Sequence, residues 1–179
     1  MKRILTGITP SGYPHLGNYI GAIKPSLDLL DEKCESFLFI ADLHAIIKVS
    51  DPSKLDELSN AIAIAWLASG LDPNTTSFYR QSDVPEITEL AWLLSCITEK
   101  GLLNRAHAYK AAVDQNNESG KKEMDEGISV GLFSYPLLMA SDILTPNATH
   151  VPVGKDQQQH LEITRDIAEK FNSKYGKFF

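Results

Sequence analysis

The sequence contains little cysteine and no cluster of metal-ligating residues. Its two cysteines, Cys34 and Cys96, lie far apart and outside any Cys-x-x-Cys pair, which argues against a disulfide framework or a cysteine-bound zinc ion. The five histidines show no His-x-His or His-x-x-x-His spacing. We therefore predict free thiols in a reducing, cytoplasmic compartment and no metal site held by protein side chains.

Long apolar runs and an excess of positive charge are also missing. No segment approaches the roughly 18 apolar residues of a membrane span, and MKRILTGITPSGYP lacks the apolar core of a signal peptide. The 17 Lys and Arg residues are outnumbered by 23 Asp and Glu, for a formal net charge of −6. This balance argues against broad, nonspecific nucleic-acid binding by the chain, with a local basic patch as the alternative. The missing apolar run predicts no membrane contact.

Short apolar runs alternate with helix-length amphipathic segments. We expect strands at four of these runs: Arg3–Gly7, Ser36–Asp42, Ser77–Gln81 and His150–Gly154. Strands separated by helices form right-handed crossovers and a parallel sheet, so the predicted fold class is α/β. Such a sheet binds ligands beyond the carboxyl ends of its strands.

Helix boundaries can be read from capping residues. Asp51 can cap a helix that ends at Gly70, and a second helix is expected from Pro85 onward. A third begins after Asp156, with Gln159 reaching back in a capping box. The polar stretch at residues 112–127, rich in helix breakers, predicts a surface loop.

Two glycines, two prolines and a histidine stand in the segment TPSGYPHLGN, residues 9–18, directly after the first expected strand. Gly7 and Gly12 let the backbone approach a ligand closely, and the helix that opens at Gly17 attracts phosphate. His15 can donate a hydrogen bond to a phosphoryl oxygen. The segment predicts a phosphate site, and a Gly/Pro surface turn is the alternative that one loop leaves open.

A second segment, SYPLLMASDIL at residues 134–144, places polar groups on an apolar helix. Tyr135, Met139 and Asp142 are spaced four and three apart and share one helix face. A carboxylate in this apolar setting needs a partner, although a surface acid or helix cap explains it equally well.

A third segment, VPVGKDQQQHLEITRDIAEKFN, turns from a strand into a helix at Gly154–Asp156, with Gln157 following. It forms a second polar rim opposite the first, and an ordinary capped helix is the alternative.

These three segments, in this order, resemble the class I aminoacyl-tRNA synthetases and the tryptophanyl-tRNA synthetase family in particular. PHLGN resembles the His-x-Gly-His signature in a His-x-Gly-Asn form, and the continuation YIGAI is similar to that family. The resemblance covers residues 1–179 and stops before the second signature, Lys-Met-Ser-Lys-Ser, and the anticodon-binding domain. It implies one Rossmann-like catalytic domain with helices on both faces, part of a longer enzyme and weakly active alone.

The resemblance implies an enzyme that activates L-tryptophan with ATP and its accompanying Mg²⁺, then transfers it from tryptophanyl-adenylate to tRNA(Trp). It also implies a homodimer. The helical segment Pro85–Ala108 carries apolar residues on more than one face, which fits a helix packed on two sides, one of them at a partner subunit. A deep core position is the alternative.

The resemblance assigns site residues as well. ATP contacts fall on Thr9, Pro10, Ser11, Gly17, Asn18, Gly154, Lys155 and Asp156. Tryptophan contacts fall on Asp142, Tyr135, Met139, Gln157 and His44, with the Asp142 carboxylate accepting the indole N–H. The expected catalytic residues are His15, Asn18 and Lys110, of which Lys110 meets the ATP phosphates. A satisfied core histidine at His44 and a solvated lysine at Lys110 are the alternatives.

Two positions depart from the family pattern. Thr9 stands where bacterial members usually have Gln, and Pro25 falls inside the following helix and predicts a kink. Other interpretations also stay open. A tyrosyl-tRNA synthetase-like enzyme is disfavoured by GNYIGA and GKDQQQH, and a small nucleotidylyltransferase by Asn18. A fragment that binds substrates without catalysis is the third alternative.

Overall fold

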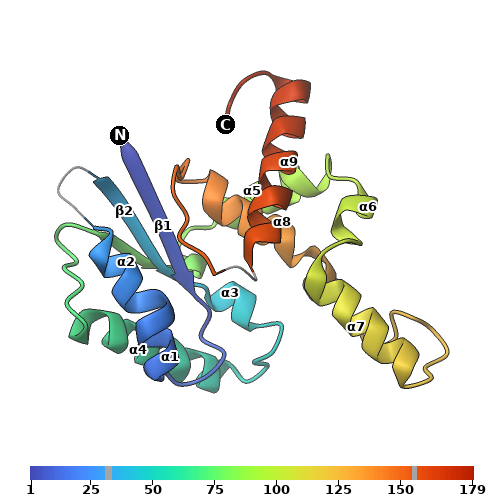
Figure 1. Ribbon diagram of the computed structural model, residues 1–179, viewed down its shortest axis with the longest axis horizontal. Helices are drawn as coiled ribbons and strands as arrows, with labels where there is room; N and C mark the ends of the chain where they lie inside the picture. Colours follow the sequence, from blue (N-terminus) through green and yellow to red (C-terminus); the bar gives the residue numbers. More distant parts are fainter. Residues whose placement is uncertain (31–33, 155–156) are drawn as a thin grey trace.

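A parallel sheet organises the chain. The computed structural model describes residues 1–30, 34–154 and 157–179 (Figure 1). Among these residues, three strands pair in the order β1-β2-β3, with bounds Lys2–Ile8, Cys34–Ile40 and Ser77–Arg80. The register places Ile8 opposite Ile40 and Ile40 opposite Arg80, so the three carboxyl ends meet at one edge of the sheet. Three of the four predicted strands are therefore confirmed.

The fourth predicted strand, His150–Gly154, is wrong. His150 makes one isolated parallel bridge with Ile4, and its carbonyl accepts the Leu5 N–H at 3.0 Å. Pro152 has no N–H with which to continue the ladder. The segment therefore lies beside β1 as an extended loop.

The helical elements follow in chain order: α1 (Leu16–Asn18), η1 (Tyr19–Ile23), α2 (Lys24–Asp28), α3 (Asp42–Ala45), α4 (Pro52–Ala68), η2 (Gln81–Asp83), α5 (Glu86–Ser95), α6 (Lys100–Leu103), α7 (His107–Glu118), α8 (Val130–Leu144) and α9 (Gln158–Tyr175). The loop expected at 112–127 is thus wrong in its first half, since α7 extends to Glu118. The expected helical segment Pro85–Ala108 is likewise broken into α5, α6 and the start of α7.

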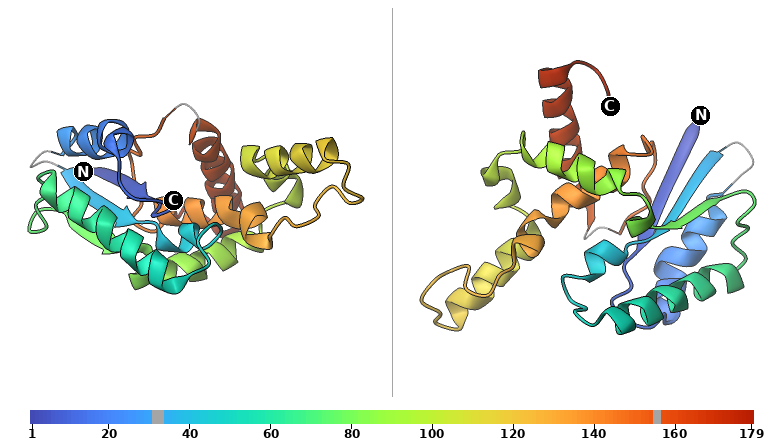
Figure 2. Two further views of the ribbon diagram at one scale, coloured as in Figure 1. Left: turned by 90° about the horizontal axis from the view of Figure 1, so that it is seen from below. Right: turned by 180° about the vertical axis from the view of Figure 1, so that it is seen from behind.

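Helices cover both faces of the sheet, as predicted. Because side chains alternate along a strand, Leu38 and Ile40 of β2 face the side covered by η1, α2 and α4. Phe39 faces the opposite side, where it shares a cluster with Ile143 of α8. A third cluster joins α5, α6, α8 and α9 away from the sheet. Both views in Figure 2 show α7 and the loop after it projecting away from the sheet.

Local helix signals have mixed outcomes. Asp51 caps α4 as predicted, its carboxylate accepting the Ser53 N–H at 2.9 Å. The Gln159 side chain, predicted to reach back toward Asp156 in a capping box, accepts the His107 N–H and donates to the Arg105 carbonyl, at 3.0 and 2.9 Å. The cap proposed for Asp156 lies outside the described residues.

The helix irregularity expected at Pro25 takes the form of a π-helical turn. The Lys24 N–H donates to the Tyr19 carbonyl, five residues back, and Pro25 then lies in the first turn of α2. Since proline has no N–H to donate, widening the preceding turn accommodates it. No helix among the described residues is long and apolar enough to cross a membrane.

Candidate active site

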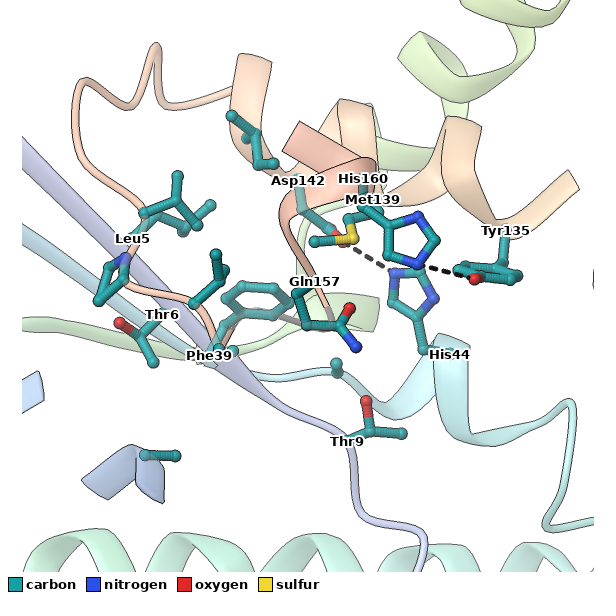
Figure 3. A pocket seen from close by; sticks show the side chains of 18 of the residues that line it. Leu5, Thr6, Thr9, Phe39, His44, Tyr135, Met139, Asp142, Gln157 and His160 are labelled. Carbon is teal, nitrogen blue, oxygen red and sulfur yellow. Dashed lines mark hydrogen bonds and ion pairs between the residues drawn. The ribbon is translucent and has the colours of Figure 1, made fainter. Parts of the chain in front are cut away.

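A cavity of about 670 Å³ opens at the carboxyl ends of β1 and β2, between η1 and α2 on one side and α8 on the other. Figure 3 shows Asp142, His44, Tyr135, Met139 and His160 gathered at one end of the cavity. The carboxyl edge of a parallel sheet is where this fold class binds ligands. The cavity is therefore the candidate active site.

The Asp142 carboxylate lies in the wall of the cavity. Its residue is only 2% exposed, and its Oδ2 lies 3.0 Å from Nε2 of His44. Burial raises the pKa of Asp142, while hydrogen bonds from His44 and Gln81 act in the opposite direction. The carboxylate that the sequence placed among apolar residues is thus buried and partnered.

Gln81 supplies the second partner of this carboxylate, and sequence reasoning gave it no role. Its side-chain amide donates to Oδ1 and Oδ2 of Asp142 at 2.8 and 3.0 Å. Its Oε1 accepts the backbone N–H of His44 at 3.3 Å. The available signal was position, because Gln81 directly follows a strand whose carboxyl end faces the site.

Asp42 positions His44 by holding the start of α3 in place. The Asp42 carboxylate is buried and accepts the backbone N–H of Ser82 at 3.1 Å as well as its hydroxyl. These bonds join α3 to η2, the two short elements that follow β2 and β3. The start of α3, and with it His44, is therefore held against the neighbouring strand end.

Tyr135 and His160 form a second polar pair on the cavity wall. The Tyr135 hydroxyl lies 2.9 Å from Nε2 of His160, and burial raises the pKa of Tyr135. The Tyr135 ring meets the His44 ring edge-on, with centroids 6.2 Å apart. In Figure 3 the Gln157 amide points into the space between these side chains and Thr9. All five residues predicted to contact tryptophan line this one cavity.

The predicted nucleotide residues have different outcomes, and Gly17 and Asn18 are not among the described lining residues of the cavity. Thr9, Ser11 and Gly154 line the cavity. Lys155 and Asp156 lie outside the described residues. Pro10 is buried, and Lys110 is exposed. Lys110 is not among the described residues that line the cavity, whereas Lys48 is.

His15, Gly17 and Asn18 form a compact turn at the start of α1. The Gly17 N–H donates to Nδ1 of His15 at 3.1 Å, and the His15 N–H donates to the Asn18 side chain at 3.0 Å. This reciprocal cap orders the start of α1, which follows the cavity-lining residues Thr9 and Ser11 in the chain. The histidine is therefore the N-cap of the helix that the sequence predicted to open at Gly17.

Two glycines that the sequence predicts to admit a ligand have different protein surroundings. A Cβ on Gly7 would meet the Phe39 ring at 2.4 Å, so the missing side chain makes room for an aromatic ring. A Cβ on Gly12 would meet no described atom within 4 Å. Gly7 therefore serves packing at the cavity wall, and Gly12 stands in open space.

The loop before α1 is anchored by a contact that sequence reasoning missed. The Tyr13 hydroxyl bonds to the Glu57 carboxylate and accepts from Nζ of Lys54 at 2.9 Å. The Lys54 ammonium also lies 4.3 Å from the centroid of the Tyr13 ring. The loop is thus fastened to the first turns of α4.

The chain has a parallel α/β sheet with a buried carboxylate and a glycine-rich loop at its ligand-binding edge. These features fit the catalytic domain of a class I aminoacyl-tRNA synthetase. The profile described as tRNA synthetases class I (W and Y) matches residues 1–179, and the chain belongs to this family. The family resemblance drawn from the three sequence segments is confirmed.

Within that family, similar relatives are tryptophan–tRNA ligases. The tryptophan–tRNA ligase of Bordetella pertussis is 58% identical over 178 residues, which cover 99% of this chain and 39% of that protein. The tryptophan–tRNA ligase of Neisseria meningitidis is 56% identical over 179 residues, covering 99% and 53%. This chain thus spans about half or less of the length of these relatives.

A solved structure agrees with these relatives. The tryptophanyl-tRNA synthetase of Campylobacter jejuni, complexed with ADP and tryptophan, matches with a TM-score of 0.85 and 49% identity. The match covers 98% of this chain and 52% of that chain. Tyrosyl-tRNA synthetase from Archaeoglobus fulgidus, at 22% identity and a TM-score of 0.72, shares the fold.

Proposed function

We propose that residues 1–179 form the ATP- and amino-acid-binding catalytic domain of a tryptophan–tRNA ligase. The reaction joins L-tryptophan and ATP into tryptophanyl-adenylate, releases pyrophosphate, and transfers the amino acid to tRNA(Trp). The single observation that carries this proposal is the buried Asp142 carboxylate in the wall of the cavity. An acceptor-only group there suits the indole N–H, which is a donor only.

The cavity walls fit the remainder of the amino acid. Leu5, Phe39 and Met139 supply apolar surface for the indole ring. The Gln157 amide and the Tyr135 hydroxyl, which line the same cavity, hold the α-amino group in this proposal. These contacts leave the substrate carboxylate pointing toward the nucleotide rim.

The nucleotide occupies the rim formed by Thr9, Ser11 and Gly154, beside the capped turn of His15 and Asn18. Mg²⁺ enters with the ATP phosphates as part of the substrate. The tryptophan carboxylate attacks the α-phosphorus in line, a new P–O bond forms, and the bond to pyrophosphate breaks. Positioning and charge stabilisation drive this step, without a covalent protein nucleophile.

The complete enzyme acts in the cytoplasm as a homodimer. Trp92 and Leu93 on α5 are 71% and 56% exposed, a large apolar surface for a chain alone in water. A second copy of the chain is the partner that covers this surface.

Calorimetric titration of the chain with L-tryptophan, L-tyrosine and L-phenylalanine tests the proposed substrate. A site that hydrogen-bonds a substrate N–H can reject an analogue without it by on the order of 10⁴-fold. We expect tryptophan to bind far more tightly than both competitors. Equal affinity for tryptophan and phenylalanine contradicts the proposal, and preference for tyrosine supports the tyrosyl enzyme instead.

A further inference from the structure

Gln81 is a fully buried polar residue that contacts both Asp142 and His44 of the cavity wall. Its side chain is 0% exposed, and its amide bonds Asp142 on α8 and the backbone of His44 on α3. We propose that Gln81 is a specificity-determining positioning residue that orients the Asp142 carboxylate toward the indole N–H. This inference rests on the proposed tryptophan site.

The distribution of donors around the carboxylate supports this role. A carboxylate offers about four lone-pair sites on its two oxygens. Oδ2 of Asp142 receives Nε2 of His44 and Nε2 of Gln81, each at 3.0 Å. Oδ1 receives only the Gln81 amide, at 2.8 Å, among the described residues. Oδ1 therefore retains an acceptor site for a substrate donor, while Oδ2 is already used.

The Gln81 amide itself has one permitted orientation. Its Oε1 faces a backbone N–H, and its Nε2 faces a carboxylate. Rotating the amide by half a turn would set oxygen against carboxylate and N–H against N–H. Both contacts would be repulsive and buried, so the amide stays locked and fixes the carboxylate that it contacts.

Charge provides the second reason. Burial favours the protonated form of Asp142, which would place a proton on the acceptor that the indole needs. Gln81 donates to the ionised form without adding a charge of its own to the cavity. Gln81 thus helps to hold the Asp142 carboxylate in one orientation and in its ionised form.

The experiment compares two ligands that differ in one donor. L-tryptophan and its benzothienyl analogue, in which sulfur replaces the indole N–H, are titrated into the parent chain and into Gln81→Met. The substitution keeps the side-chain length and removes both hydrogen-bonding groups. We expect tryptophan affinity to fall about tenfold or more and analogue affinity to stay constant, so their ratio collapses.

Two controls make the result decisive. Gln115→Met, the same change at an exposed site on α7, should leave both affinities unchanged. Gln81→Glu keeps the side-chain shape and sets a second carboxylate against Asp142. It should lower the ratio of tryptophan affinity to analogue affinity as Gln81→Met does. If Gln81→Met does not fold, Gln81→Glu takes its place in the comparison. In either variant tryptophan binding should also be lost at a higher pH than in the parent.

The outcomes separate this inference from the proposed function. An unchanged ratio in a folded variant overturns the role of Gln81, as does an equal loss for both ligands, which indicates a merely structural role. A parent chain that binds both ligands equally overturns the tryptophan site itself.

Discussion

Nε2 of His44 and Oδ2 of Asp142 lie 3.0 Å apart although 98 positions separate them in the chain. One follows β2, and the other lies near the end of α8. The contact forms because the two elements meet at the carboxyl edge of the sheet. The amino-acid end of the cavity is therefore defined by tertiary structure rather than by one motif.

The affinity for tryptophan should fall as the pH decreases from neutral. Protonation of Asp142 removes the acceptor for the indole N–H, and burial raises its pKa above the ordinary 3.8. The affinity is complete above this raised pKa and is lost as the pH falls through it, earlier than an ordinary aspartate would allow. Calorimetric titration across mildly acidic pH measures the profile.

Asp142→Asn is the matched control for that profile. The amide cannot titrate, so its weaker affinity should vary less with pH than that of the parent chain. Identical pH profiles in parent and variant would show that another group controls binding.

Gly17→Ala should weaken ATP binding by about tenfold or more. The added Cβ would lie 2.8 Å from the His15 ring and would break the reciprocal cap that orders the loop. Gly12→Ala, in the same loop but with no described atom within 4 Å, should bind ATP as the parent does. Equal affinities for all three chains in a nucleotide titration would remove the loop from the ATP site.

Gly7→Ala should destabilise the fold by about 1–3 kcal/mol, because its Cβ overlaps the Phe39 ring. Adding Phe39→Leu should recover part of this loss by vacating the space. Gly101→Ala places the same methyl group on α6 with no described neighbour within 4 Å and should be neutral or stabilising. Urea unfolding of the four chains measures the differences, and a neutral Gly7→Ala would contradict the packing argument.

Trp92→Ser should shift the chain from dimer to monomer. The substitution removes the largest exposed apolar side chain of α5, the surface that we assign to the partner copy. Ile64→Ser deletes an exposed apolar side chain from α4 and should leave the dimer intact. Sedimentation velocity distinguishes these states, and a monomeric parent would refute the assignment.

The parts of the site that the sequence predicted depend on local periodicity. Tyr135, Met139 and Asp142 share a helix face in α8 as their spacing requires, and Asp51 caps α4 as its position requires. The predicted fourth strand was wrong because the rule against proline inside a sheet strand was not applied to Pro152.

The undetected contacts depend on distant segments. Gln81 reaches Asp142 across 61 positions, and Tyr13 reaches Glu57 across 44. Neither partner can be chosen before the neighbouring strands and helices are placed, because each side chain has many possible donors or acceptors in sequence alone. Long-range hydrogen bonds between ordinary polar residues therefore escaped the sequence analysis.

The Gln159 amide, which accepts the His107 N–H and donates to the Arg105 carbonyl, ties the first turn of α9 to the start of α7. It lies in the first turn of α9, two residues after Gln157, whose amide points into the cavity. The far end of α7 projects away from the sheet (Figure 2). The base of α7 is therefore fixed to the same turn of α9 that presents Gln157 to the cavity.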